Sequence, residues 1–139
     1  MENRCFFLNS GSEATELALR LARAYTGRKS VLAARMGYHG VTNAALDASP
    51  YKWERRPLPD TLHVIEVGGD INEITNKSPI GTFIIESALS VGGVVFPPSG
   101  WLMKTMDVIR CQGGVTICDE IQVRREFQES PICTDVTKD

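Results

Sequence analysis

Histidine is scarce in this chain and closely spaced cysteines are missing, which limits the metal sites that it could form. Only two histidines occur in 139 residues, His39 and His63, and they lie far apart in the sequence. The four cysteines form no CxxC pair; they are Cys5, Cys111, Cys118 and Cys133. Structural zinc sites use closely spaced Cys and His ligands. The sequence therefore predicts no metal site.

Long apolar runs and an excess of one charge are also missing. The longest stretch without a formal charge, residues 87–103, contains glycines and prolines that exclude a continuous membrane-spanning helix. Fifteen Lys and Arg against 17 Asp and Glu give a net charge of -2 and no basic stripe, so we expect neither a nucleic-acid nor a membrane partner. The apolar run at residues 5–8 is too short for a secretory signal. With no targeting segment visible, we expect an intracellular protein, cytoplasmic or mitochondrial.

Short apolar runs alternate with amphipathic stretches along the chain, which is typical of a mostly parallel sheet with crossover helices. Strands are expected at residues 4–8, 31–34, 62–67, 80–86 and 115–118, the first and last of them buried. Helices are expected at residues 13–26, 43–46 and 99–111. The apolar face of the first helix is expected to consist of Ala14, Leu17, Ala18, Leu21 and Tyr25. The sequence thus predicts the α/β fold class.

Residues 9–13, Asn-Ser-Gly-Ser-Glu, predict a capped helix start. Ser10 is expected to accept a hydrogen bond from the backbone three residues on, and Glu13 to reach back, as in a capping box. Unpaired N–H groups and the positive end of the helix dipole meet at such a start and favour a phosphate. Gly11 would let a ligand approach the backbone closely, and the Ser12 hydroxyl would add a donor. A plain helix cap with water in that position is the alternative.

Two expected strands end on acids, Glu86 and Asp119, at the sheet edge where open α/β folds place ligand contacts. A buried carboxylate needs a partner, which can be a Lys or Arg, a metal or a protonated heterocycle of a ligand. An ordinary ion pair with a Lys or Arg of the chain is the alternative to a ligand. Tyr38 and His39 occupy a glycine-flanked loop at the same expected edge; taken singly, they read as a packing tyrosine and a hydrogen-bonded loop histidine. Together these features match a ligand with a phosphate, a flat ring and a protonated ring nitrogen. Pyridoxal phosphate has all three.

Four motifs, in order along the chain, resemble the signatures of class III pyridoxal-phosphate aminotransferases. They are residues 9–14 (Asn-Ser-Gly-Ser-Glu-Ala), 37–40 (Gly-Tyr-His-Gly), 86–87 (Glu-Ser) with Gly-Gly and Pro-Pro pairs beyond, and 118–122 (Cys-Asp-Glu-Ile-Gln). Residues 17–27 and 49–53 are most similar to the alanine-glyoxylate aminotransferase 2-like group, which includes phospho-lyases acting on phosphorylated amines such as ethanolamine phosphate. The resemblance implies part of the large domain of a fold-type I pyridoxal-phosphate-dependent transferase.

The resemblance also implies roles for individual residues. Asp119 would pair with the ring nitrogen of pyridoxal phosphate, and Glu86 would lie near the substrate; these two are the candidate catalytic residues. The cofactor would further be bound at its phosphate by Gly11 and Ser12, at its ring by Tyr38, His39 and Ile121, and at its phenolic oxygen by Gln122. The implied partners are a small amine or amino-acid substrate and, in the full-length family, a second copy in a homodimer.

The resemblance covers residues 3–123. We interpret residues 1–123 as a partial pyridoxal-phosphate-binding large domain and residues 124–139 as a divergent tail. The Schiff-base lysine of the family is expected after one further strand beyond Asp119, and Lys138 is not expected to replace it, so we expect no turnover by this chain alone. Residues 68–79 are expected to have lost most of a helix. A non-catalytic module that pairs with a full-length relative is the alternative. A Rossmann-type nucleotide binder is a third, although Ser-Gly-Ser is a poor substitute for Gly-x-Gly-x-x-Gly.

Overall fold

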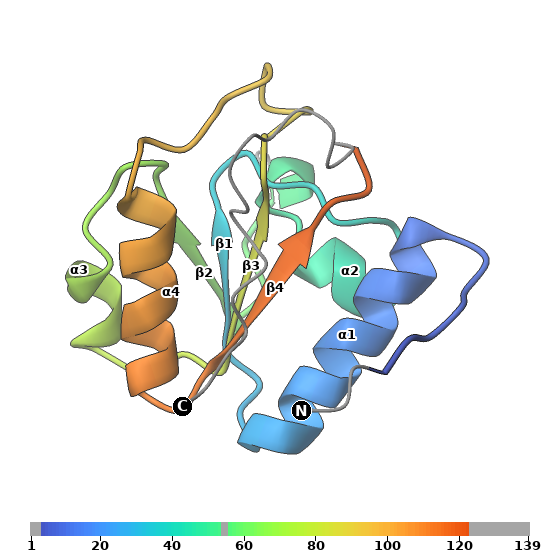
Figure 1. Cartoon of the computed structure of the whole chain (residues 1–139), viewed down its shortest axis with the longest axis horizontal. Helices are drawn as coiled ribbons and strands as arrows, with labels where there is room; N and C mark the ends of the chain where they lie inside the picture. The colour runs from blue at the N-terminus through green and yellow to red at the C-terminus, as the bar shows by residue number, and fades with distance from the viewer. Residues whose placement is uncertain (1–3, 54–55, 123–139) are drawn as a thin grey trace.

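The computed structural model describes residues 4–53 and 56–122; the divergent tail and Lys138 lie outside the described residues. Four parallel strands form one sheet in the order β2-β1-β3-β4 (Figure 1). The strands are β1 (Val31–Ala34), β2 (Leu62–Ile65), β3 (Thr82–Glu86) and β4 (Val115–Asp119). The α-helices are α1 (Gly11–Thr26), α2 (Asn43–Asp47), α3 (Asn72–Thr75) and α4 (Trp101–Cys111), and a 3-10 turn spans Pro50–Trp53.

Helices cover the sheet on both faces, with α1 and α2 on one side and α3 and α4 on the other (Figure 1). Each face has its own core: Leu32, Phe83 and Ile85 pack toward α4, whereas Val31, Ala33 and Ile84 pack toward α1 and α2. A parallel sheet buried on both faces needs strands that are apolar throughout. The near-continuous burial of β1 and β3 meets this need, and the expectation of an α/β fold is confirmed.

The register of β3 and β4 decides which side chains share a face. Glu86 pairs with Asp119 and Ile84 with Ile117. Side chains two apart on a strand lie on the same side of a sheet, and Ile84 and Ile117 belong to the core under α1 and α2. Glu86 and Asp119 therefore lie side by side on the α1 face, at the carboxyl ends of their strands.

The start and end of α1 are built as the sequence predicts. Ser10 Oγ accepts the N–H of Glu13 at 3.2 Å, and the Glu13 carboxylate accepts the N–H of Asn9 at 2.9 Å. Gly27 ends the helix in the left-handed conformation at φ 67°. The helix begins at Gly11, two residues before the predicted start. In Figure 1 this start lies near the tip of β4.

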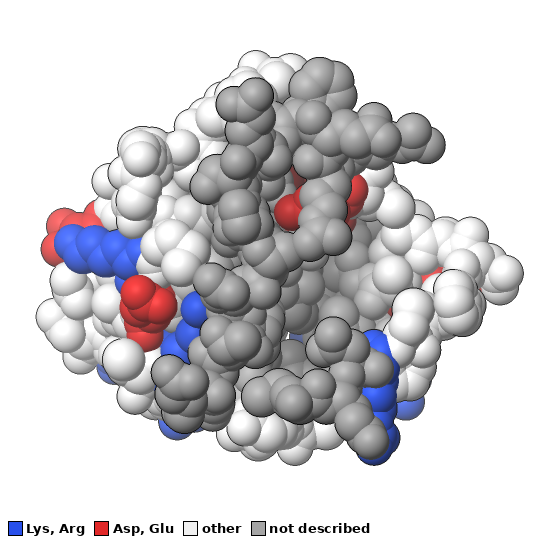
Figure 2. Space-filling view, viewed as in Figure 1, with Lys and Arg blue, Asp and Glu red and all other residues white. Residues whose placement is uncertain are grey.

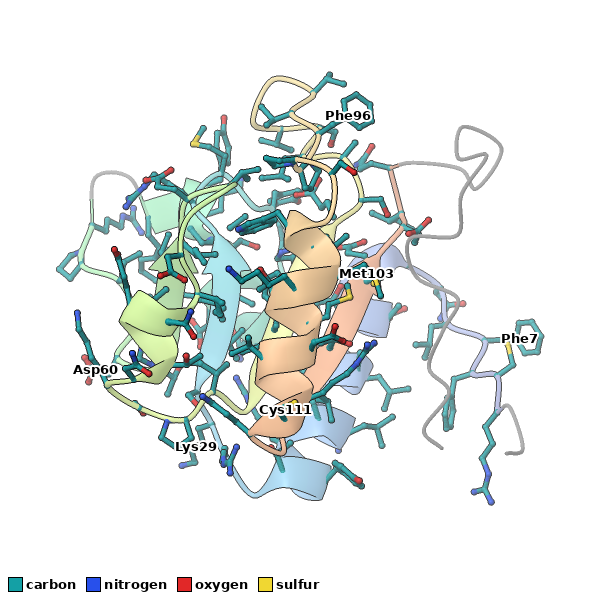
Figure 3. All side chains as sticks on the ribbon, turned by 60° about the vertical axis from the view of Figure 1, so that its left-hand side comes forward. Phe7, Lys29, Asp60, Phe96, Met103 and Cys111 are labelled. Atoms are coloured by element: carbon teal, nitrogen blue, oxygen red, sulfur yellow. The ribbon has the colours of Figure 1, made fainter. Side chains whose placement is uncertain are left out.

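Two expectations for the N-terminal region are wrong. Residues 4–8 form no strand: they pair with no other strand of the described chain, and the Phe7 side chain is 94% exposed and projects away from the body (Figure 3). The buried face of α1 consists of Thr15, Leu19 and Ala22, whereas Leu21 and Tyr25 are 49% and 73% exposed. The leucines and alanines of α1 occur on more than one side of the helix, so helical spacing alone could not choose the buried side.

The remaining elements follow the expectations more closely. Helix α4 occurs within the predicted range 99–111 and buries Leu102, Thr105, Met106 and Ile109. Strand β4 is only partly buried, contrary to the prediction, because it is the outer strand of the described sheet. The segment 68–79 contains only the four-residue α3. No helix in the described ranges is long and apolar enough to cross a membrane.

Candidate functional site

The predicted site residues come from three places that meet at the carboxyl edge of the sheet: the start of α1, the loop at residues 37–42, and the ends of β3 and β4. Ile121, just beyond β4, lies against the start of α1, since a Cβ added to Gly11 would lie 2.7 Å from Ile121 Cγ1. Ile121 is otherwise 64% exposed. Gln122 is exposed, and no hydrogen bond joins its side chain to another described residue.

The start of α1 offers two backbone donors without helical partners. The first turn closes with the N–H of Ala14 donating to Ser10 O at 3.0 Å. Because the N–H groups of Gly11 and Ser12 precede this bond, the helix itself provides them no acceptor. Together with the helix dipole, they favour an anion at this point. The glycine at position 11 leaves the approach free of a side chain of its own.

Ser12 also ties α1 to the loop at residues 37–42. Its hydroxyl oxygen accepts the N–H of Val41 at 3.1 Å, and its carbonyl accepts the Thr42 hydroxyl at 3.1 Å. Gly40 packs so closely that an added Cβ would lie 2.6 Å from Ser12 Oγ. The Ser12 hydroxyl proton is not used by the Val41 contact, so Ser12 can still donate to a ligand.

A buried pair joins His39 to Asp119. His39 Nδ1 lies 2.9 Å from Asp119 Oδ2, and the two side chains are 0% and 7% exposed. A carboxylate is an acceptor, so Nδ1 carries the proton and donates it to Asp119. The other Asp119 oxygen accepts the N–H of Ile121 at 3.2 Å, and the backbone N–H of His39 donates to Ser49 Oγ at 2.8 Å. Asp119 is thereby fixed from two sides.

The second ring nitrogen of His39, Nε2, is buried and has no hydrogen-bond partner within residues 4–53 and 56–122. Buried polar atoms are normally hydrogen-bonded, and an exception in a native fold marks a place where a further group or a water belongs. The atom lies close to the backbone of the loop, since a Cβ on Gly37 would be 3.2 Å from it. This unmet hydrogen-bonding capacity is at the candidate site itself.

Glu86 is 1% exposed and binds loops rather than a cation of the described chain. Oε1 accepts the N–H of Tyr38 at 2.9 Å. Oε2 accepts the N–H of Ser90 at 3.2 Å and the Ser90 hydroxyl at 3.4 Å. The carboxylate thus connects the 37–42 loop to the loop after β3 and orients the backbone of Tyr38.

Two functional candidates were not predicted from the sequence. The first is Lys52, whose Nζ lies 5.1 Å from the centre of the Tyr38 ring and 5.5 Å from that of Tyr51. Such distances are typical of cation–π contacts. The sequence signal at this position was the Tyr51–Lys52 pair. Lys52 lies near Tyr38 because the chain folds back there, with the N–H of Tyr51 donating to Gly37 O.

The second missed residue is Glu16, on the second turn of α1. One carboxylate oxygen accepts the N–H of Ala44 at 2.8 Å. Burial acts to raise the pKa of Glu16, but the Thr42 side chain, the N–H groups of Ala44 and Ala45 and the charge of Arg23 together hold the pKa below its ordinary value. Nothing in the sequence places position 16 beside positions 42–45, so this contact depends on the tertiary fold.

Described residues away from the candidate site also border a cavity. A cavity of about 150 Å³ lies on the opposite face of the sheet, and none of the predicted site residues lines it; its lining is Gly68, Gly69, Asp70, Ile71, Trp101, Lys104 and Thr105. No group of three or more metal-ligating side chains occurs in the part of the chain that the structure describes. Where the described atoms are visible in Figure 2, acidic and basic side chains are interspersed.

Comparisons with known proteins agree on one group. The model of the family Aminotransferase class-III matches residues 1–123. The chain is 38% identical to an alanine-glyoxylate aminotransferase 2-like protein of Drosophila melanogaster, over 86% of this chain and 30% of that protein. It is 30% identical to an ethanolamine-phosphate phospho-lyase homolog of Caenorhabditis elegans, over 84% of this chain and 32% of the relative.

A solved structure resembles the chain in both fold and sequence. It is an Arthrobacter phospholyase in complex with phosphoethanolamine, with a TM-score of 0.69 and 27% identity over 83% of this chain and 33% of that one. The chain therefore spans about a third of the length of the relatives it matches.

Proposed function

The chain belongs to the class III aminotransferase family, and from this we propose that residues 1–123 form the part of an active site that binds pyridoxal phosphate. The observation that carries the proposal is the buried His39–Asp119 pair at the carboxyl edge of the sheet, near the start of α1 where Ile121 packs. A carboxylate fixed in this way suits a protonated ring nitrogen, and a helix start suits a phosphate.

The described residues fit the cofactor in three respects. The N–H groups of Gly11 and Ser12 have no helical acceptor, and Gly11 has no side chain of its own between them and a phosphate, although Ile121 packs closely against Gly11. Ile121 packs against this start and supplies apolar surface there for a flat ring. The Tyr38 ring is proposed to cover the cofactor ring on family resemblance. The unpartnered Nε2 of His39 is a polar atom for which the chain supplies no partner in its described part. Gln122 is proposed for the phenolic oxygen on family resemblance alone.

When bound, pyridoxal phosphate supplies an electron sink for charge that develops at the substrate carbon next to the amine. Asp119 keeps the ring nitrogen protonated, which maintains that capacity. His39 holds Asp119 in place through Nδ1, and Ile121 does so through its N–H. Glu86 orients Tyr38 by accepting its N–H, so we assign it a positioning role beside the substrate rather than a proton transfer.

For the full-length protein we propose a small amine or amino acid as substrate, with either amino-group transfer or elimination of phosphate as the reaction. One relative is named for alanine-glyoxylate amino transfer and another for ethanolamine-phosphate lysis, so the two names support both reactions. We propose no turnover by the 139-residue chain tested alone. Lys52 is the lysine of the described part that contacts a candidate residue, and it lies over the Tyr38 ring rather than beside Asp119.

Titration of the chain with pyridoxal phosphate tests the proposal. Binding is followed by the circular dichroism that the cofactor acquires in an asymmetric site, for the wild type, Asp119→Asn and the control Asp107→Asn on α4. We expect Asp119→Asn to weaken binding by about tenfold, the order of one lost charge-assisted hydrogen bond, and the exposed Asp107 to have no effect. Equal affinity of all three proteins would refute the assignment of Asp119.

A second candidate function is a non-catalytic module that pairs with a full-length relative as the family's homodimer does. Exposed large apolar side chains favour it: Phe7, Phe96 and Tyr25 are each more than half exposed, and Phe7 and Phe96 project from the surface in Figure 3. Single exposed apolar residues are ordinary, and a contiguous patch of them marks an interface, so the co-purification below decides this candidate. Co-purification of a tagged chain with a full-length class III aminotransferase, lost in Phe7→Ser, would support it; a chain that stays monomeric in the relative's presence would exclude it.

A further inference from the structure

Two residues on one side of α1 hold the loop that carries Tyr38 and His39. Ser12 and Glu16 are four apart, so their side chains lie on the same side of the helix. Ser12 contacts Val41 and Thr42, and Glu16 contacts Ala44. The loop and the following helix α2 are thus joined to the same two turns of α1 whose start offers the N–H groups of the proposed phosphate site.

Glu16 performs the capping that α2 lacks locally. Thr42 occupies the N-cap position of α2 but makes no side-chain capping bond. Glu16 Oε2 instead accepts the N–H of Ala44 at 2.8 Å. A side-chain oxygen that satisfies a free helical N–H stabilises the helix start, whichever segment supplies it. Here the cap comes from another helix, so it fixes α2 relative to α1.

The position of α2 determines the position of His39. Ser49, which follows α2, accepts the N–H of His39 at 2.8 Å and donates to Ala45 O at 2.6 Å. Glu16 is therefore connected to Ser49 through the Ala44–Ala45 backbone of α2, and Ser49 is connected by hydrogen bonds through His39 to Asp119. Displacement of α2 would move His39 and leave the start of α1 in place.

We propose that Glu16 is a positioning residue: it fixes the Tyr38–His39 loop at a set distance from the start of α1 and so aligns the ring-binding groups with the phosphate-binding groups. This assignment rests on the proposed function and adds to it a residue that touches neither cofactor nor substrate. Glu16 is partly buried and borders Thr42, Ala44 and Ala45, with Arg23 as the charged group that acts on it. Its negative charge matches the positive end of α2.

The experiment compares Glu16→Ala and Glu16→Gln with the control Glu73→Ala in the 139-residue chain. Glu73 is an exposed carboxylate in the first turn of the short helix α3, which lies on the opposite face of the sheet from Glu16. Three quantities are measured: hydrogen exchange at the amides of Ala44 and Ala45, affinity for pyridoxal phosphate, and affinity for inorganic phosphate alone.

We expect Glu16→Ala to speed exchange at Ala44 and Ala45 and to weaken pyridoxal phosphate binding, each by about tenfold, the order of a lost helix cap. Affinity for inorganic phosphate should stay within about twofold, because phosphate needs only the start of α1. Glu16→Gln keeps an acceptor oxygen and should fall between Glu16→Ala and the wild type. Glu73→Ala should match the wild type in all three quantities.

Different failures have different meanings. If Glu16→Ala binds pyridoxal phosphate as well as the wild type does, the positioning role is wrong and the proposed function stands. If phosphate and pyridoxal phosphate weaken together, the change disturbs α1 as a whole, which also overturns the assignment. If the wild type does not bind pyridoxal phosphate, the proposed function fails and the assignment fails with it. Should Glu16→Ala not fold, Glu16→Gln decides between these outcomes.

Discussion

Gly40→Ala is expected to destabilise the fold far more than another substitution at a left-handed glycine. Gly40 has φ 126°, and a Cβ there would lie 2.6 Å from Ser12 Oγ and 2.9 Å from Ser12 Cα. Gly93 also has a positive φ, 98°, but a Cβ there would meet nothing within 4 Å. Comparing Gly40→Ala with Gly93→Ala separates the loss of stability due to the backbone conformation from the loss due to the contact with α1.

The magnitude follows from these two terms. An L residue with positive φ costs about 1–2 kcal/mol at either position. At Gly40 the added methyl group also presses on the backbone of Ser12, and such overpacking costs about 1–3 kcal/mol more. We therefore expect the free energy of unfolding to fall by about 1–2 kcal/mol for Gly93→Ala and by about 2–5 kcal/mol for Gly40→Ala.

Urea unfolding followed by far-UV circular dichroism measures both losses, provided that the slope with denaturant is unchanged. Because Ser12 belongs to the proposed phosphate site, Gly40→Ala should also weaken pyridoxal phosphate binding, whereas Gly93→Ala should not. Equal losses of unfolding free energy in the two variants would refute the tight contact between the 37–42 loop and α1.

Three further predictions concern the core, the surface and the response to acid. Phe83→Ala removes a fully buried ring whose centre lies 6.5 Å from the centre of the Trp101 ring, edge to face, and should lower the free energy of unfolding in urea by about 3–5 kcal/mol. A loss below about 1 kcal/mol would contradict the packing of the sheet face under α4. Tyr25→Ser, at an exposed position of α1, should change the free energy of unfolding by less than about 0.5 kcal/mol in the same assay. A large loss would show that Tyr25 lies on the buried side of α1. Folding lowers the pKa of Glu16 from 4.5, because its hydrogen bonds and Arg23 outweigh burial, so its stabilisation is full above pH 4.5 and is lost as the pH falls through the folded-state pKa. Urea unfolding of wild type and Glu16→Gln should accordingly differ more at pH 6 than at pH 3, and a difference that does not depend on pH would contradict this account.

Local signals in the sequence were sufficient for the helix caps and for most of the strands. Ser10, Glu13 and Gly27 act on residues within four positions of themselves, so their roles can be read from neighbouring letters. The proximity of Asp119 to His39 was predicted only as a shared sheet edge; the 2.9 Å contact across 80 positions depends on how the loop folds back.

Non-local contacts explain what the sequence did not predict. Glu16 looks like one more polar residue of an amphipathic helix until α2 packs against it. Lys52 looks like a surface charge until the chain returns its segment to Tyr38. The strand expected at residues 4–8 has suitable apolar residues but no neighbouring strand among the described ones, and a strand without a neighbour leaves its N–H and C=O groups unpaired.

The most direct test of the central claim is residue-resolved: the change in backbone amide NMR signals when pyridoxal phosphate is added to the isotope-labelled chain. The account predicts shifts at Gly11, Ser12, His39 and Ile121, with the signals of α3 on the opposite face unchanged. Shifts confined to α3 and α4, or no saturable shift at all, would contradict a cofactor site at the carboxyl edge of the sheet.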